Sequence, residues 1–262
     1  MTSPLLELNG VTKRFGRVVV AEDLSLAVGA GDTVGIVGPN GAGKTSVFGL
    51  VSGDLGPDAG EVRFTGRPVT RLDAAARCRL GIGRTYQVPR PFGEMTVFEN
   101  LLVAAQQGGG LRRRASYAAA VEALERTGMS AQANSPAERL GLLQRKRLEL
   151  ARALATQPTL LLLDEVAGGL TDPEVAQLVE IVRAVNAGGT AVIWIEHVVR
   201  ALTATVSRLI CLSGGKFVGD GDPAVVLAEP AVREVFLGSE VTAALAGGTL
   251  EAPVPDGERG ES

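Results

Sequence analysis

The chain of 262 residues carries a formal net charge of −3, and only 4% of its residues are aromatic. This length suffices for one large domain, or for a domain with an inserted subdomain. The slight negative charge argues against nucleic acid as the main ligand, because affinity for a phosphate backbone requires clustered Lys and Arg.

Cysteine content and hydropathy favour a protein of the cytosol. Cys78 and Cys211 are the only cysteines and stand far apart, so neither a disulfide framework nor a metal cluster is expected. No apolar run reaches the roughly 18 residues that span a bilayer, and residues 1–8 lack the basic and apolar regions of a signal peptide. We therefore expect a cytoplasmic protein that reaches a membrane only through a partner.

The N-terminal part of the chain predicts an antiparallel β layer. Residues 6–16 and 21–28 alternate between apolar and polar side chains, and residues 60–66 form a further short run bounded by glycines. Phe15 stands directly before a glycine, where its ring could stack on a purine. On its local pattern, packing into a core is at least as good an interpretation.

A glycine-rich stretch at residues 38–45 reads Gly-Pro-Asn-Gly-Ala-Gly-Lys-Thr, which is the spacing of a P-loop. A short buried strand is predicted before it at 31–37, and a helix from Ser46. Such a loop can turn backbone N–H groups toward phosphate oxygens, while Lys44 reaches the β- and γ-phosphates and the Thr45 hydroxyl ligates Mg²⁺. The alternative is a glycine-rich turn with a surface lysine. The candidate nucleotide-binding residues here are Gly38, Pro39, Asn40, Gly41, Ala42, Gly43, Lys44, Thr45 and Ser46.

A helix and a short strand are expected next. Residues 72–80 are rich in Ala and Arg, and residues 81–87 are strand-like and end at Gln87. Pro89 and Pro91 keep the following segment out of a helix. Gln87 could therefore be a movable ligand to a metal ion or a water, and a solvated loop glutamine is the local alternative.

The segment 89–156 looks wholly helical and lies between β-rich halves, which predicts a helical subdomain inserted in an α/β core. Helical patterns cover residues 96–106, 116–127 and 141–156, and the first of them opens with a Thr cap. Arg112-Arg-Arg114 is expected to form a solvated loop; the alternative is that it binds an acidic lipid surface or a loop of a partner protein.

Two further apolar strands end in polar residues. Residues 159–163 run into Asp164 and Glu165, and this strand should lie inside a covered parallel sheet. Asp164 could then face the P-loop and hold Mg²⁺ through water, whereas Glu165 would be free to polarise a water in line with the γ-phosphate; an ordinary helix-capping pair is the alternative. Residues 190–197 end at His197, the only histidine. It is either a packing residue or a ligand-binding group at the C-terminal edge of the sheet.

The C-terminal part predicts a hairpin and a closing helical region. Residues 207–212 and 216–221 read as two strands around a Gly-Gly turn, and residues 223–237 as helical. The tail over 239–262 mixes small residues with Pro and acids, so it is expected to be mobile.

In their order and spacing these motifs resemble the ATP-binding subunit of an ABC transporter, over residues 5–238. The resemblance implies a P-loop NTPase core, with an antiparallel β subdomain and the inserted helical subdomain, that binds and hydrolyses ATP with Mg²⁺. It also implies that Phe15 stacks on adenine, that Gln87 senses the metal and the membrane partner, and that His197 contacts the γ-phosphate. The implied metal ligands are Thr45, Gln87 and Asp164, and the implied catalytic residues are Glu165 and His197.

The same resemblance implies transmembrane permease subunits and a second ATPase subunit as partners, on the inner face of the cell membrane. Within the family, residues 84–103, 195–197 and 235–238 are most similar to the importers of branched-chain amino acids. The insert around residues 108–116 is similar to the longer of that importer's two ATPase subunits. The lipopolysaccharide-export ATPase and the urea importers share much of the pattern and stay open as alternatives.

The chain also departs from the family pattern. Where the family has Leu-Ser-Gly-Gly-Gln, this chain has Leu140-Gly-Leu-Leu-Gln144, and Val166 and Thr171 replace the usual Pro and Asp or Asn. In this family each ATP lies between the P-loop of one subunit and the signature of the other. The departure at 140–144 should therefore weaken the site on the partner's P-loop and predicts a heterodimer whose other subunit has an intact signature.

Two competing hypotheses follow from the same sequence. A regulatory nucleotide-binding subunit with weak hydrolysis would also fit the altered signature. An ABC-type ATPase acting on DNA or in translation is weakened by the lack of a long coiled coil, a second nucleotide domain and a large basic face.

Overall fold

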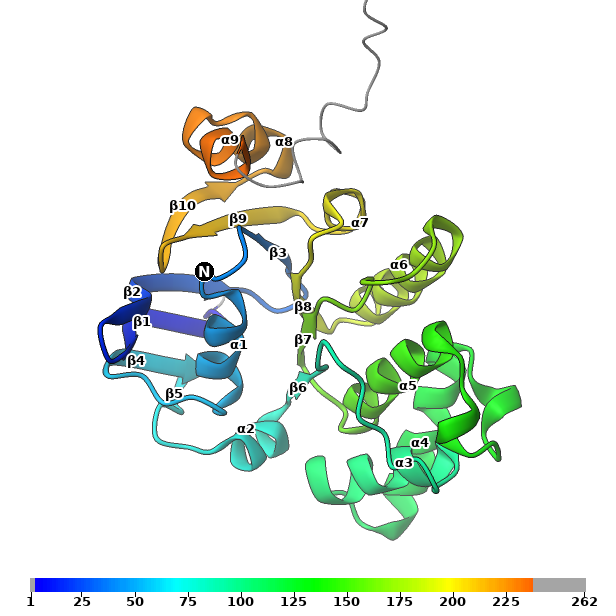
Figure 1. The fold of residues 1–262 in the computed structure, drawn as a ribbon. Coiled ribbons are helices and arrows are strands. Elements are labelled where there is room, and N and C mark those ends of the chain that lie inside the picture. Colours follow the sequence, from blue (N-terminus) through cyan, green and yellow to red (C-terminus); the bar gives the residue numbers. More distant parts are fainter. Residues whose placement is uncertain (1–2, 238–262) are drawn as a thin grey trace, which may run out of the picture.

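The computed structural model describes residues 3–237, so the predicted mobile tail at 239–262 lies outside the described residues. The described chain forms two β-sheets with helices around them (Figure 1). Within residues 3–237, no helix combines the length and the apolar character needed to cross a membrane. The predicted α/β fold class is confirmed.

The first sheet is antiparallel and holds the N-terminal strands. Its members are β1 (Leu6–Phe15), β2 (Val18–Val28), β4 (Ala59–Phe64) and β5 (Arg67–Pro68). They pair in the order β2-β1-β4-β5, and Leu6 of β1 lies opposite Val28 of β2. Leu6 and Leu8 are buried while Glu7 between them is half-buried, as an alternating strand with one covered face requires. The predicted antiparallel layer is confirmed.

The second sheet carries the strands that end at the predicted motifs. Its members are β3 (Thr33–Val37), β6 (Ile82–Arg84), β7 (Leu160–Asp164), β8 (Ala191–Ile195), β9 (Arg208–Ser213) and β10 (Lys216–Gly221). The order is β10-β9-β3-β8-β7-β6; all neighbours are parallel except the hairpin of β9 and β10. Every residue of β3, β7 and β8 is buried, which confirms the interior position predicted for the strand at 159–164.

The strand predicted at 81–87 is shorter in the structure. β6 is the edge strand of the sheet, and its pairing with β7 ends with Arg84 opposite Leu162. Gln87 therefore lies in the loop beyond the strand, on an exposed backbone turn that leads to Pro89. Beyond Arg84 the N–H of Asp164 donates to the Thr85 hydroxyl at 3.1 Å, so a side chain replaces the main-chain partner and the ladder ends.

The six-stranded sheet has a separate hydrophobic core on each face. Leu160 and Leu162 of β7 join the core that lies toward the antiparallel sheet, together with Phe48 of α1 (Lys44–Ser52). Leu161 and Leu163 point to the other face, where the core includes residues of α5 (Leu142–Ala155) and α6 (Asp172–Ala187). Because successive side chains of a strand point to opposite faces of the sheet, an apolar strand contributes to both cores.

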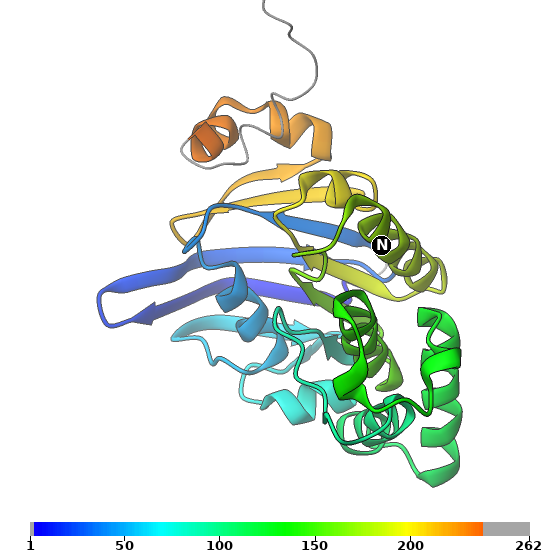
Figure 2. The same ribbon diagram turned by 45° about the vertical axis from the view of Figure 1, so that its right-hand side comes forward.

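The chain between β6 and β7 is helical, as predicted. It contains α3 (Val97–Val103), the π-helical turn η1 (Ala104–Gly108), α4 (Arg113–Thr127), two 3₁₀ turns (Ser130–Gln132 and Ala137–Arg139) and α5. Figure 2 shows these green helices grouped at one side of the sheets. A capping box of Thr96 and Glu99 starts α3.

The loop predicted for Arg112-Arg-Arg114 is wrong in part. Arg112 is the N-cap of α4, and the next two arginines belong to its first turn, although all three side chains are exposed. The Ala-rich run that follows has high helix propensity, and it extends the helix toward the N-terminus through arginines, which are good helix formers themselves.

Four short helices complete the fold. They are α2 (Ala74–Leu80), α7 (Val199–Thr203), α8 (Pro223–Ala228) and α9 (Pro230–Leu237). α8 and α9 contact the terminal hairpin, so the closing helical region predicted at 223–237 is confirmed. α1 begins at Lys44 rather than at Ser46, which places the lysine and the hydroxyl of Thr45 in its first turn.

Candidate active site

The glycine loop between β3 and α1 is pressed against two other strands. Gly43 has φ of 104°, and a Cβ at this position would lie 2.2 Å from the carbonyl oxygen of Val20. A Cβ at Gly38 would lie 2.1 Å from the carbonyl oxygen of Leu212. Both approaches are possible for glycine alone. No described side chain caps the start of α1, so its first N–H groups can meet an anion.

Lys44 is held by the loop that it follows. Its side chain is buried, and Nζ donates to the carbonyl oxygens of Gly38 at 2.7 Å and Pro39 at 3.0 Å. Burial lowers the pKa of Lys44, and the charges of Glu165 and Asp164 oppose that shift. The ammonium group is therefore placed between the P-loop and the carboxylates, where it can bind a phosphate oxygen as a point charge.

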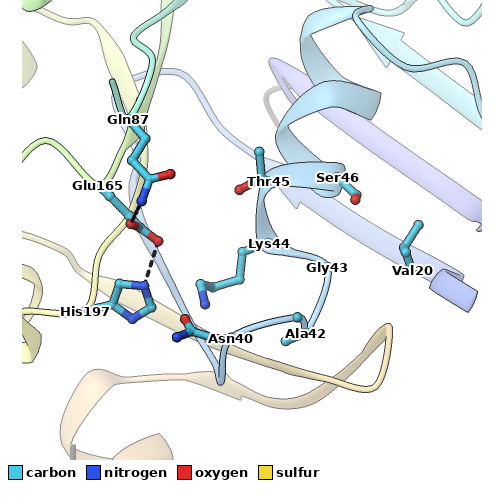
Figure 3. Close-up of a pocket in the computed structure, with 11 residues that line it drawn as sticks. Val20, Asn40, Ala42, Gly43, Lys44, Thr45, Ser46, Gln87, Glu165 and His197 are labelled. Carbon is cyan, nitrogen blue, oxygen red and sulfur yellow. Dashed lines mark hydrogen bonds and ion pairs between the residues drawn. The ribbon is translucent and has the colours of Figure 1, made fainter. Parts of the chain in front are cut away.

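A pocket of about 680 Å³ opens over the loop and brings distant motifs together (Figure 3). One wall is the P-loop and the first turn of α1, and the opposite wall consists of Gln87, Glu165 and His197. In Figure 3, Thr45 and Lys44 face these three side chains across the pocket. The lining residues are Val20, Asn40, Gly41, Ala42, Gly43, Lys44, Thr45, Ser46, Gln87, Glu165 and His197.

Both carboxylate oxygens of Glu165 contact a side chain of the pocket, and its role in polarising a water stays a prediction. His197 Nε2 lies 2.6 Å from Oε1, and Gln87 Nε2 donates to Oε2. Glu165 itself has φ of 48°, in the left-handed region that residues other than glycine rarely adopt. The reason for the contacts is topological: the loops after β6, β7 and β8 meet at one edge of the sheet.

Asp164 sits beside the pocket with one oxygen paired and one available. Arg84 Nη2 lies 3.1 Å from its Oδ2, while the buried Oδ1 accepts no hydrogen bond within residues 3–237. Burial raises the pKa of Asp164, and the guanidinium of Arg84 opposes that shift. A neighbouring cavity of about 430 Å³ is lined by Asp164, Thr45 and Gln87, among others. An unpaired buried carboxylate oxygen near a hydroxyl and an amide suits Mg²⁺, which prefers oxygen ligands.

Phe15 lies apart from the other candidate residues. It ends β1 and is 52% exposed, with Lys13 Nζ 5.6 Å from the ring centroid. The structure does not bring Phe15 into the lining of the pocket. Its predicted stacking on a purine therefore stays a prediction.

The altered signature forms the start of α5. Gly141 is its N-cap, and Leu142 is 49% exposed, so the N-terminal end of this helix is open to a partner. Leu142 also packs near Gly169, where a Cβ would meet its Cδ2 at 3.3 Å. Of the two smaller departures, Val166 is fully buried and Thr171 caps α6 with Glu174 in a capping box.

Sequence reasoning missed three residues at this site. Val20 lines the pocket from β2, and no local pattern marks it. Glu196 is 2% exposed and accepts hydrogen bonds from the N–H groups of Ala167 at 2.5 Å and His197 at 3.2 Å; its position next to His197 at a strand end is a signal that could have found it. Lys146 on α5 is buried and donates to the two loops that carry Gln87 and Glu165.

Comparison with known proteins supports one family. The model of the ABC transporter family matches residues 21–168. The chain is 36% identical over 253 residues to the high-affinity branched-chain amino acid transport ATP-binding protein LivG of Salmonella typhimurium, covering 91% of this chain and 99% of the relative. It is 34% identical over 255 residues to the corresponding protein BraF of Pseudomonas aeruginosa, again covering 91% and 99%.

Solved structures show the same fold. A nucleotide-free ATP-binding cassette from an ABC transporter superposes with a TM-score of 0.83 at 28% identity, covering 90% of this chain and 100% of that chain. An ATP-binding cassette in its ADP conformation gives a TM-score of 0.83 at 28% identity, covering 91% and 100%. The resemblance read from the motifs is therefore confirmed by both kinds of comparison.

Proposed function

The chain belongs to the ABC transporter family, whose ATP-binding subunits hydrolyse ATP, and from this membership we propose that it energises a membrane permease for branched-chain or other hydrophobic amino acids. The observation that carries the proposal is the pocket in which the P-loop faces Glu165 and His197. The names of LivG and BraF support the class of substrate.

In this proposal the residues of the pocket divide the work between binding and reaction. The N–H groups of residues 38–45 and the ammonium of Lys44 bind the phosphates. Thr45, Gln87 and the free Oδ1 of Asp164 would hold Mg²⁺, which when bound neutralises charge on the phosphate oxygens. Phe15 would stack on adenine.

Glu165 and His197 act at the γ-phosphate. The Glu165 carboxylate, oriented by its contact with His197 Nε2, accepts a hydrogen bond from the attacking water and directs the lone pair of that water at phosphorus. His197 lines the same pocket and would donate a hydrogen bond to a γ-phosphate oxygen. Catalysis is then largely a matter of positioning and of charge stabilisation.

Glu165→Gln tests the assignment. The amide keeps the shape and the ability to bind a water but removes the base, so turnover should fall by about 100-fold or more while ATP binding is retained and a stable nucleotide-bound dimer accumulates. Glu180→Gln is the matched control, because its side chain is 69% exposed on α6. Unchanged turnover in Glu165→Gln would refute the role of this carboxylate.

The altered signature supports a second ATPase subunit as partner. Bulky Leu142 at the exposed start of α5 would crowd a phosphate that this helix end could otherwise bind. We therefore propose a heterodimer in which an intact partner signature serves the P-loop of this chain. ATPase activity should be low for the purified chain alone, rise with such a partner, and rise also in the G141S/L142G/L143G variant alone.

The second candidate function is a regulatory subunit with weak hydrolysis, which the same altered signature favours. No activity with or without a partner of intact signature would support it. Transport assays with the assembled complex separate amino acids from urea or lipopolysaccharide, the substrates of the related systems. If the assembled complex transports its substrate but this chain hydrolyses no ATP in it, the first proposal is excluded.

A permease is the membrane partner in this proposal, and the chain would lie on the inner face of the membrane through it. The loop after β6 supports this role, because Tyr86, Val88 and Phe92 are exposed apolar side chains around Gln87. Exposed aromatic and aliphatic groups next to a catalytic loop suit a protein interface. Y86E/V88E should reduce co-purification with the permease and leave nucleotide binding by the chain intact.

A further inference from the structure

Lys146 is a buried cation that the proposed mechanism does not use. It lies in the second turn of α5 and is 5% exposed. Its Nζ donates to the carbonyl oxygen of Gln87 at 2.9 Å and to that of Glu165 at 3.1 Å. We propose that Lys146 is a positioning residue that fixes the main chain of Glu165 and of the glutamine loop, and so makes the water-orienting carboxylate depend on the position of the helix that carries the altered signature.

The backbone of Glu165 explains why such support is needed. Its φ of 48° is in the left-handed region, which a side-chain-bearing residue keeps only when its surroundings hold it there. The N–H of Glu165 donates to the carbonyl oxygen of Ile195 at 2.9 Å, which anchors one side of the residue to β8. The ammonium of Lys146 holds the carbonyl on the other side, so the conformation is fixed from both ends.

The electrostatic surroundings keep the cation in place. Burial lowers the pKa of the Lys146 ammonium, and four carboxylates oppose that shift; they lie on α5, at the end of β7, and directly after β7 and β8. They are Glu196, Glu165, Glu149 and Asp164. A buried ammonium that is surrounded by opposite charge and bonded to two carbonyl groups is well satisfied. Its removal would leave both carbonyl groups without their charged donor and the carboxylates without their shared counter-charge.

The contact joins three parts of the site. Gln87 and Glu165 already touch through their side chains, and Lys146 joins the same two residues through their main chains. Lys146 is anchored on α5, which begins at Leu142 directly after Gly141. A shift of α5 that follows contact between the signature and a partner's nucleotide would therefore reach the carboxylate through one side chain. This inference rests on the proposed role of Glu165.

The test compares Lys146→Met with Lys146→Arg in the assembled transporter. Methionine keeps the length and apolar stem but cannot donate, whereas a guanidinium can donate to both carbonyl groups. Because hydrogen bonds from a charged donor are strong, Lys146→Met should lower kcat by about 10- to 100-fold and leave the KM for ATP within about threefold, whereas Lys146→Arg should recover most of the rate. Lys216→Met is the control, since its side chain is 60% exposed on the far hairpin.

A second readout does not depend on turnover. Backbone hydrogen exchange at residues 165–168 should be faster in Lys146→Met than in the wild type or in Lys216→Met, because the left-handed turn loses its support. If Lys146→Met does not fold, Lys146→Leu replaces it with the same expectations, because leucine also has no donor. A kcat within about twofold of the wild type, or a loss of rate that only matches a loss of nucleotide affinity, would overturn the inference.

Glu165→Gln measured in parallel separates the two proposals. If Glu165→Gln is inactive and the Lys146 variants retain wild-type kcat, the catalytic assignment stands and the positioning role of Lys146 fails. If Glu165→Gln retains its rate, the proposed function of the carboxylate fails first.

Discussion

The substitution Arg77→Met removes a buried cation that caps the C-terminal end of α1, the helix that follows the P-loop. Arg77 is 0% exposed, and its guanidinium donates to four main-chain carbonyl groups: Leu50 at 2.6 Å, Val51 at 2.9 Å, Thr70 at 3.1 Å and Leu72 at 3.1 Å. The first two belong to the last turn of α1, whose carbonyl groups have no partner in the helix. A cation at this end also complements the helix dipole.

The magnitude follows from the carbonyl groups that lose their donor. A buried acceptor left without a partner costs about 1–3 kcal/mol, and the two helix carbonyls are the ones whose bonds to Arg77 are most buried. Methionine retains the packing of the aliphatic stem. We therefore expect the free energy of unfolding to fall by about 3 kcal/mol, which at about 2–4 °C per kcal/mol corresponds to a Tm lower by about 6–12 °C.

Thermal unfolding followed by circular dichroism measures this change, and Arg79→Met is the matched control. Arg79 lies on the same helix, α2, and its side chain is exposed, so its replacement should leave Tm within about 2 °C. A similarly small change in Arg77→Met would mean that water or a shifted donor satisfies the carbonyl groups, and the capping argument would fail.

Three further outcomes are expected. Gly43→Ala should abolish ATP binding in equilibrium dialysis while the fold persists. A Cβ would lie 2.2 Å from the carbonyl oxygen of Val20, so the loop would have to open. An affinity for ATP within about threefold of the wild type would contradict this. Burial raises the pKa of the Cys211 thiol to about 11, so at neutral pH the thiolate is scarce and iodoacetamide should modify Cys211 only after unfolding, as mass spectrometry would show. Asn100→Leu should lower the free energy of unfolding by about 2 kcal/mol and speed proteolysis of the loop before α3. The reason is that Asn100 Oδ1 accepts from the N–H of Phe92 at 2.8 Å and Nδ2 donates to the carbonyl oxygen of Phe92 at 3.0 Å. Equal cleavage rates in the variant and the wild type would contradict this.

Features with a local signal could be predicted from the sequence. The P-loop follows a strand and opens a helix within about one turn, so its spacing alone identifies it. The apolar run into Asp164 is specific because only a strand covered on both faces needs apolar side chains at every position. The exceptions are at boundaries: β6 ends at Arg84 and α4 begins at Arg113, because sheet-edge pairing and helix extension depend on neighbours in space.

Features that arise from contact between distant segments could not be predicted. Lys146 stands between Arg145 and Arg147 in a basic run. Arg147 donates to Gln177, whereas Lys146 is buried against the loops that carry Gln87 and Glu165. The three basic residues differ in which side of α5 they occupy and in whether that side faces the edge of the sheet. Val20 likewise lines the pocket because β2 passes under the P-loop, a contact that no property of its own strand reveals.

The strand order explains how motifs from four parts of the chain form one site. In β3-β8-β7-β6 the strands are parallel, so the loops after them lie at the same edge: the P-loop after β3, His197 after β8, Glu165 after β7 and Gln87 after β6. The helical segment is inserted between β6 and β7, and α5 returns directly into β7. Both ends of the insertion are therefore attached to strands that lead into site residues. A rotation of the helical segment relative to the sheet would move the loop of Gln87 and, through Lys146, act on Glu165.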